Sequence, residues 1–174
     1  MSLKVGIVGL GIMGGSFAKN LRDANFEVCG FDILDDNIQN LVSLGGNAGS
    51  SPRDVATQSD VVITSLPSIA AFHEVMSGKD GLKDAKKDGL IIIECSTLPI
   101  DEKQAAHDTL AEIGSILMDC PISGTGAQAI NKDLSVYVSG EEAMLEKCQD
   151  VLNGFANFTF YVGVFGNGSK MKFV

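Results

Sequence analysis

Tryptophan is absent from this sequence of 174 residues, histidine occurs only twice, and positive charge is scarce. The 13 Lys and Arg residues are outnumbered by 22 Asp and Glu residues, which gives a formal net charge of −9. No basic cluster is longer than Lys86-Lys87, so the phosphate backbone of a nucleic acid would meet mainly repulsion. We therefore expect no nucleic-acid partner.

Long hydrophobic runs are also missing. No apolar stretch without glycine is longer than residues 90–93, whereas a membrane helix needs roughly 18 residues. Glycines interrupt the first apolar run, and charged residues follow it in place of a small-residue cleavage site. We therefore predict no signal peptide and no membrane partner, and we expect a cytoplasmic location.

Metal-ligand patterns are absent as well. The four cysteines are widely spaced and form no Cys-x-x-Cys pair; they are Cys29, Cys95, Cys120 and Cys148. Neither a zinc site nor a redox dithiol is indicated, and reduced, buried thiols are expected. His73 and His107 have no partner pattern, so we interpret them as surface or packing residues.

Apolar segments with the length of strands alternate with segments of helical spacing. The predicted strands cover residues 4–8, 27–31, a short segment near Ala48, 61–65, 90–95 and 116–120. The predicted helices cover residues 13–24, 36–44, 52–58, 69–76 and 101–113. Strands that are nearly continuous runs of Val, Ile and Leu are typical of parallel sheets covered on both faces. The expected fold is α/β: a Rossmann-type doubly wound, mostly parallel sheet with helices on both faces.

Local signals refine this pattern. Ser51-Pro52 predicts a helix start, and Gly45 after a leucine predicts a helix stop. The last third of the chain is expected to contain a strand at 134–138, a helix at 141–152 and a strand at 159–162, followed by glycine-rich turns that lead into residues 169–174.

Three glycines, Gly9, Gly11 and Gly14, form the pattern G-x-G-x-x-G where the first strand meets the first helix. In such a motif one glycine makes a tight turn, one lets the backbone approach a pyrophosphate, and one lets the helix pack closely on the strand. Asp32 follows about 20 residues later at the end of the second strand, where a ribose hydroxyl would lie. The pattern predicts nucleotide binding, with a merely structural turn as the alternative.

Asp32 also indicates which cofactor binds. A carboxylate accepts a hydrogen bond from the 2′-hydroxyl of NAD but repels the 2′-phosphate of NADP. Asp35 and Asp36 add to this repulsion, and no arginine follows, so NAD is favoured over NADP. Alternatively, Asp35 and Asp36 simply cap the second helix.

The sequence resembles the β-hydroxyacid dehydrogenase family, which includes 3-hydroxyisobutyrate dehydrogenases and tartronate semialdehyde reductases. The resemblance extends over essentially the whole chain. Its motifs are Gly9-Leu10-Gly11-Ile12-Met13-Gly14, Leu66-Pro67, Ser96-Thr97, Asp119-Cys120-Pro121-Ile122-Ser123-Gly124, and Gly166-Asn167-Gly168 followed by Lys172.

The resemblance implies an enzyme that transfers a hydride between NAD and a small 3-hydroxy acid, or that reduces a semialdehyde in the reverse direction. The opening motif would hold the cofactor through Leu10, Ile12 and Met13 as well as its glycines, and the nicotinamide half would lie against Leu66, Pro67 and Thr97. Ser123 and Gly124 would hold the substrate carboxylate, and Lys172 would be the general acid/base. Ser96-Thr97 has a second interpretation, as a cap for the helix near residue 101.

Some residues depart from the family pattern. Thr125 stands where a further glycine is common, and Gln128 and Lys132-Asp133 replace commoner small residues. These departures leave the substrate open but not the type of chemistry.

The family continues beyond the catalytic lysine with an interdomain helix and a helical domain. The resemblance therefore divides this chain into an NAD-binding domain at residues 1–164 and the start of the interdomain helix at 165–174, with the C-terminal helical domain absent. We expect the short final helix to fray, NAD still to bind, and turnover by this chain to be very weak. The full-length protein is expected to be a homo-oligomer.

Two other interpretations remain open. One is a noncatalytic nucleotide-binding module of the same fold, although Lys172 argues against it. The other is an enzyme similar to 6-phosphogluconate dehydrogenase, whose preference for NADP suits Asp32 poorly.

Overall fold

A computed structural model, which describes residues 1–174, contains a six-stranded parallel sheet at its centre. The strand order is β3-β2-β1-β4-β5-β6. The strands are β1 (Val5–Val8), β2 (Val28–Phe31), β3 (Asn47–Ala48), β4 (Val61–Thr64), β5 (Ile91–Glu94) and β6 (Ile116–Asp119). The order reverses direction between β1 and β4, which is the point where doubly wound folds bind ligands at the carboxyl ends of their strands.

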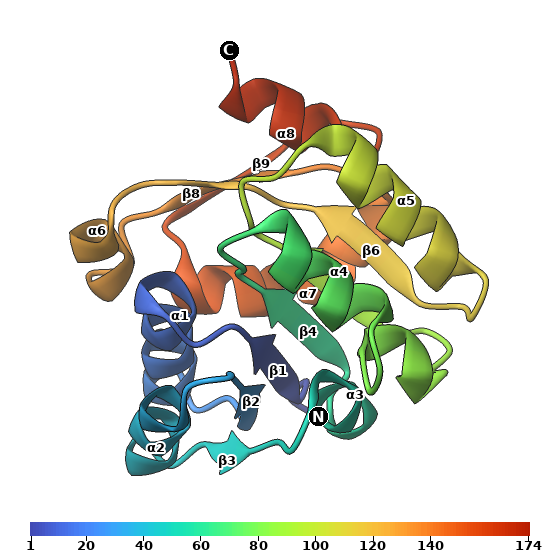
Figure 1. Ribbon diagram of the computed structural model, residues 1–174. Coiled ribbons are helices and arrows are strands. Elements are labelled where there is room, and N and C mark those ends of the chain that lie inside the picture. Colours follow the sequence, from blue (N-terminus) through green and yellow to red (C-terminus); the bar gives the residue numbers. More distant parts are fainter.

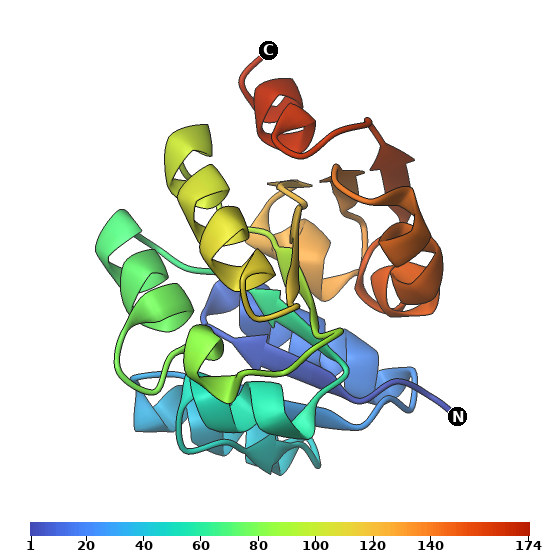
Figure 2. The ribbon, with the colours of Figure 1, turned by 90° about the vertical axis from the view of Figure 1, so that its right-hand side faces the viewer.

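Helices cover both faces of this sheet (Figures 1 and 2). They are α1 (Ile12–Asp23), α2 (Asp35–Ser43), α3 (Pro52–Gln58), α4 (Ile69–Ser77), the 3-10 helix η1 (Leu82–Ala85) and α5 (Ile100–Ala111). One hydrophobic core contains Phe17 of α1 and Leu41 of α2, and the other contains Val55 of α3, Phe72 of α4 and Leu110 of α5. The two cores lie on opposite sides of the sheet because alternate strand residues point to opposite faces.

The last third of the chain forms a smaller sheet in the order β7-β8-β9. Its elements are β7 (Ile122–Ser123), α6 (Gly126–Ile130), β8 (Ser135–Val138), α7 (Glu142–Phe155), β9 (Phe158–Tyr161) and α8 (Asn167–Lys172). An antiparallel bridge between Asp119 and Ser139 joins this sheet to the end of β6. Helix α7 packs in the same core as α1, and the rings of Phe17 and Phe155 lie 4.6 Å apart. Figure 1 shows α8 with the C-terminus at the end of the molecule opposite the N-terminus.

The fold predicted from the sequence is confirmed, with boundaries that differ by a few residues. Both local signals are also confirmed: the Ser51 hydroxyl accepts a hydrogen bond from the Asp54 N–H at the start of α3, and Gly45 follows α2 with φ of +80°. Strand β7 and helix α6 lie between residues 120 and 134, where the sequence pattern predicts no element.

The cysteine and histidine interpretations agree with the structure. All four thiols are free and buried, and burial raises the pKa of Cys29 to about 11 and that of Cys148 to about 12. His73 is exposed and pairs with Glu102, while the ring of His107 packs 4.5 Å from Phe165. In this structure no helix has both the length and the hydropathy needed to span a membrane.

Candidate functional site

The glycine-rich loop between β1 and α1 holds its three motif glycines for different reasons. Gly9 has φ of +92°, and a Cβ there would lie 2.2 Å from the Ser65 carbonyl oxygen. A Cβ on Gly14 would lie 1.8 Å from the carbonyl oxygen of Gly9. A Cβ on Gly11, in contrast, would meet no atom within 4 Å. Packing within the protein therefore requires Gly9 and Gly14, but leaves open space beside Gly11.

Asp32 is bound directly to the glycine-rich loop. Its Oδ2 accepts a hydrogen bond of 2.7 Å from the Leu10 N–H, and its Oδ1 accepts one of 2.9 Å from the Leu34 N–H. A carboxylate has about four acceptor positions, so this arrangement fixes its orientation and leaves capacity for further donors. The half-buried carboxylate thus follows β2 directly, as the sequence predicted, and it lies next to the start of α1.

Asp35 and Asp36 do not have the capping role that was one of their two interpretations. Asp35 and Asp36 lie in the first turn of α2, but the N-cap residue is Leu34 and no side chain caps this helix. The alternative that they cap α2 through their side chains is therefore wrong. Ile33, whose exposed fraction is 88%, and Leu34, at 58%, present apolar surface directly beside Asp32.

The loops after β4 and β5 are tied together. The Ser96 hydroxyl oxygen accepts a hydrogen bond of 2.8 Å from the Leu66 N–H. Pro67 and Thr97 are exposed, and Leu66 is half-buried. Helix α5 begins at Ile100 after Pro99 without a side-chain cap, so the interpretation of Ser96-Thr97 as a helix cap is wrong. Gly9 lies close to the loop after β4, since a Cβ added to Gly9 would lie 3.3 Å from Leu66 Cδ2.

Lys172 lies against the loop that contains Ile122, Ser123 and Gly124, although 50 positions separate Lys172 from Ile122 in the chain. The Lys172 ammonium donates a hydrogen bond to the carbonyl oxygen of Ile122, the neighbour of Ser123. Ser123 and Gly124 are exposed, and Gly124 has φ of +147°. This loop also approaches the glycine-rich loop, because a Cβ on Gly126 would lie 2.7 Å from Ile12 Cγ2.

Thr125 and Gln128, which depart from the family pattern, form hydrogen bonds with each other. The Thr125 hydroxyl accepts from the Gln128 N–H at 3.3 Å, and Gln128 Oε1 accepts from the Thr125 N–H at 2.8 Å. This reciprocal pair is a capping box at the start of α6.

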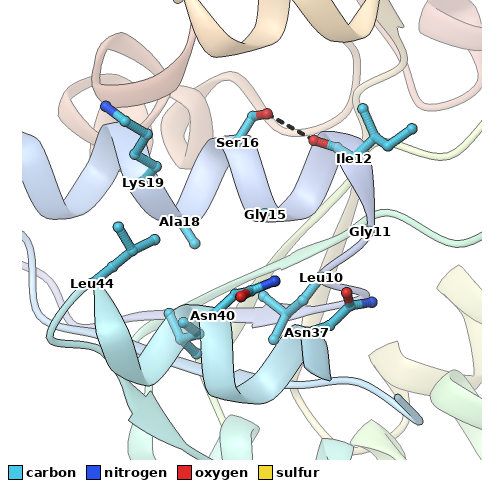
Figure 3. A pocket seen from close by; sticks show the side chains of 11 residues that line it. Leu10, Gly11, Ile12, Gly15, Ser16, Ala18, Lys19, Asn37, Asn40 and Leu44 are labelled. Atoms are coloured by element: carbon cyan, nitrogen blue, oxygen red, sulfur yellow. Dashed lines mark hydrogen bonds between the residues drawn. The ribbon is translucent and has the colours of Figure 1, made fainter. Parts of the chain in front are cut away.

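A cavity of about 440 Å³ opens between α1 and α2 beside the glycine-rich loop (Figure 3). It is lined by Leu10 and Gly11 of the loop and by Asn37 and Asn40 of α2, among others. Figure 3 shows the two asparagine side chains under α1, whereas the Lys19 ammonium points away from α2. Neither Asp32 nor the loops after β4 and β5 line this cavity, so it adjoins the site without containing it.

Three charged residues near the site are fully buried, and the sequence predicted no role for any of them: Glu94, Lys103 and Asp119. Lys103 Nζ lies 2.8 Å from Glu94 Oε2 and 2.9 Å from Asp119 Oδ1. Burial lowers the pKa of Lys103, but the charges and close polar contacts of Glu94 and Asp119 together outweigh burial and raise it. One signal was available, because Lys103 shares its helical spacing with the buried residues Ala106 and Leu110.

The geometry fits a dinucleotide. No side chain caps the start of α1, so backbone N–H groups at this helix end are available to an anion beside Gly11. A carboxylate is fixed within hydrogen-bond distance of the same loop, and apolar side chains flank it. These groups follow the carboxyl ends of β1 and β2, which are neighbours in the sheet.

Comparisons with known proteins agree with this geometry. The chain is 34% identical over 173 residues to 2-(hydroxymethyl)glutarate dehydrogenase of Eubacterium barkeri. This alignment covers 99% of this chain and 58% of that protein. It is also 34% identical to mitochondrial 3-hydroxyisobutyrate dehydrogenase of Rattus norvegicus, over 97% of this chain and 50% of that protein. The chain thus spans between half and three fifths of the length of these two relatives.

A solved structure leads to the same family. Mycobacterium tuberculosis 3-hydroxyisobutyrate dehydrogenase, determined with L-serine, superimposes with a TM-score of 0.93 at 27% identity, over 99% of this chain and 58% of that one. Residues 4–163 match the protein family described as the NAD binding domain of 6-phosphogluconate dehydrogenase. The chain therefore belongs to that family of NAD-binding domains, within the wider group of β-hydroxyacid dehydrogenases that its motifs resemble.

Proposed function

We propose that this chain is the cofactor-binding part of a dehydrogenase that transfers a hydride between NAD and a small 3-hydroxy acid. Residues 1–164 would form the cofactor domain, and residues 165–174 would begin the helix that leads to a second domain. Both the whole protein's reaction and this division rest on the relatives, whose names specify dehydrogenases of hydroxy acids and whose chains are longer.

The open space beside Gly11 is the observation that carries the proposal. No atom of the protein requires glycine there, whereas close approach of a pyrophosphate does. Gly9, Gly11 and Gly14 would hold the pyrophosphate together with the backbone at Leu10, Ile12 and Met13. The positive end of α1 adds favourable electrostatics for the two phosphates.

Asp32 supports NAD as the cofactor in preference to NADP. Its carboxylate already accepts the Leu10 and Leu34 N–H groups, and its remaining acceptor positions would accept hydrogen bonds from the ribose hydroxyls. A 2′-phosphate at that position would place two negative groups together with no arginine near them in sequence. Ile33 and Leu34 would offer apolar surface to the adenine ring.

Lys172 is the proposed general acid/base. Bound NAD supplies the hydride acceptor, and Leu66, Pro67 and Thr97 would orient its nicotinamide half. Ser123 and the Gly124 backbone would bind the substrate carboxylate, which places the substrate hydroxyl near the Lys172 ammonium that now contacts Ile122. When an alcohol is oxidised, the neutral amine of Lys172 would take the hydroxyl proton and become the ammonium as the hydride leaves for NAD. In the reverse direction the ammonium would return that proton to the alkoxide oxygen.

Ligand titration of this chain tests the cofactor assignment. Calorimetry should show that NAD binds at least tenfold more tightly than NADP. Equal or stronger binding of NADP would contradict the role of Asp32, and failure of both to bind would contradict the function itself.

Turnover tests the role of Lys172, in a protein that extends this chain with the C-terminal part its relatives have. We predict that Lys172→Ala lowers kcat for oxidation of 3-hydroxy acids about 10²- to 10⁴-fold, the usual contribution of a general acid/base. Lys170→Ala is the matched control, because Lys170 lies on the same helix but is exposed. Similar rates in the two variants would exclude the catalytic role, and NAD binding without any turnover would favour a noncatalytic module.

A further inference from the structure

The buried ionic cluster formed by Glu94, Lys103 and Asp119 has no role in the proposed chemistry. The relative exposures of its members are 0%, 1% and 0%. Its formal charges add to −1, with two carboxylates and one ammonium. Burial of charge is costly, and replacement of a buried ion pair by apolar residues is often neutral or stabilising. Stability alone is therefore a weak reason for a cluster at this position.

The first carboxylate connects the cluster to the loops proposed for nicotinamide. Glu94 Oε1 accepts hydrogen bonds from the Ser96 N–H at 3.0 Å and from the Thr64 hydroxyl at 3.2 Å. The Ser96 hydroxyl in turn accepts from the Leu66 N–H. Glu94 Oε2 is left with only the Lys103 ion pair, whose angle lies outside hydrogen-bond geometry.

The second carboxylate connects the cluster to α8. Asp119 accepts from the Ser169 N–H at 2.8 Å and from the Ser169 hydroxyl at 2.7 Å. The Ser139 hydroxyl donates to Asp119 Oδ2 at 3.2 Å, and its oxygen accepts from the Gly168 N–H at 2.9 Å. These contacts hold the first turn of the helix that carries Lys172.

Helix α8 depends on such contacts. It contains six residues, and isolated helices shorter than about 12 residues are marginal in water. Gly168 lies against the chain, since a Cβ there would be 2.6 Å from the Tyr137 carbonyl oxygen. Lys103 is the only residue that forms an ion pair with both carboxylates, and it comes from a third element, α5.

From this connectivity we infer that Lys103 is a positioning residue, which couples the loops at Leu66 and Ser96 to α8 and so fixes Lys172 relative to the nicotinamide end of the cofactor. This inference deepens the proposed function and rests on it. The Lys103 ammonium has polar contacts only with Glu94 and Asp119, so its effect passes through these two carboxylates.

The test compares NAD with ADP-ribose, which lacks the nicotinamide ring. The variants are Lys103→Met and the double variant Lys103→Met/Glu94→Gln, which keeps the net charge of the cluster at −1 and keeps an acceptor for Ser96. We expect both variants to bind ADP-ribose within twofold of the unsubstituted chain but to bind NAD at least fivefold more weakly. Lys83→Met, at an exposed lysine, should change neither affinity.

Hydrogen exchange provides the second readout. The amides of Gly168 and Ser169 should exchange at least tenfold faster in both Lys103 variants, while those of α7 keep their protection. If Lys103→Met does not fold, the charge-matched double variant still decides the question.

The outcomes separate the two proposals. If the unsubstituted chain binds neither ligand, the proposed function fails and this inference fails with it. If that chain binds both ligands but the variants change the two affinities equally or not at all, only the positioning role is overturned. Unchanged exchange at Gly168 and Ser169 would also overturn it.

Discussion

The two ends of the candidate site are built by different means. At the β1 and β2 end, the protein offers main chain, an open space beside Gly11 and one carboxylate fixed by two N–H groups. At the β5 and β6 end, a buried network of charged and hydroxyl side chains connects two loops with a helix. The first end depends on backbone conformation over a short segment. The second depends on residues that are far apart in the chain.

This difference predicts different sensitivities. Ligand binding to a site made of main chain is lost when a side-chain atom enters the site. Binding that depends on a network of charged and hydroxyl side chains weakens progressively as its contacts are removed. The glycine-rich loop should therefore respond sharply to added methyl groups, and the rest of the site should respond to changes of charge and hydrogen bonding.

The largest effect is expected for Gly14→Ala. The new Cβ would lie 1.8 Å from the Gly9 carbonyl oxygen, so the loop must move. We expect the free energy of unfolding to fall by about 3 kcal/mol or more, as for other severe steric conflicts. Urea denaturation measures this, and NAD binding should be lost.

Gly11→Ala is the matched control for that variant. Its Cβ meets nothing in the protein, so the free energy of unfolding should fall by no more than about 1 kcal/mol, the usual cost of alanine at a helix N-cap. NAD affinity should nevertheless fall at least tenfold. An alanine at position 11 that leaves NAD affinity intact would show that no ligand approaches this loop closely.

Asp32→Asn should reduce the preference for NAD over NADP. The amide keeps the shape of the side chain but removes the charge, and a hydrogen bond to a charged group contributes about 1.5–3 kcal/mol. We expect NAD affinity to fall by roughly that free energy, and the preference over NADP to shrink. Asp150→Asn, at an exposed residue of α7, should leave the NAD to NADP ratio nearly unchanged. A ratio that changes equally in both variants would point to net charge instead of a ribose contact.

Alkaline pH should destabilise the fold through its buried thiols. The pKa of Cys148 is raised from 9.0 to about 12, so the folded chain holds this proton after the unfolded chain has lost it. The stabilisation is complete below pH 9 and is lost as pH rises from there to about 12, by about 1.4 kcal/mol per pH unit for one such group. The slope of unfolding free energy against pH should be shallower in Cys148→Ala. An unchanged slope would remove Cys148 as its source.

The smallest effect is expected for Thr125→Ala. Loss of the capping box at α6 should lower the free energy of unfolding by about 1 kcal/mol. NAD affinity should stay within twofold of that of the unsubstituted chain, because the Thr125 hydroxyl bonds only to Gln128. A larger change in NAD affinity would show that this residue contributes to the cofactor site.

Several features of the fold and the site were open to prediction from the sequence. Apolar runs alternating with helical segments predicted the doubly wound sheet, and the spacing from the glycines placed Asp32 at the end of the second strand. The hydrogen bond between Asp32 and the Leu10 N–H was not predicted. Segment 121–133 was missed, because a two-residue strand and a five-residue helix carry too little periodicity to be recognised. Ser96 was partly misread, since a serine before a helix usually caps it, whereas here it accepts a hydrogen bond from Leu66.

The sequence by itself determined the parallel sheet, the glycine-rich turn and the acidic residue that closes the second strand. These follow from hydrophobic periodicity and from the backbone conformations that only glycine adopts easily, both of which act over a few residues. Only the tertiary structure decided that Lys103 lies between Glu94 and Asp119 and that Lys172 reaches Ile122. Such contacts depend on the register of neighbouring strands and on helix packing, which no single segment of the chain encodes.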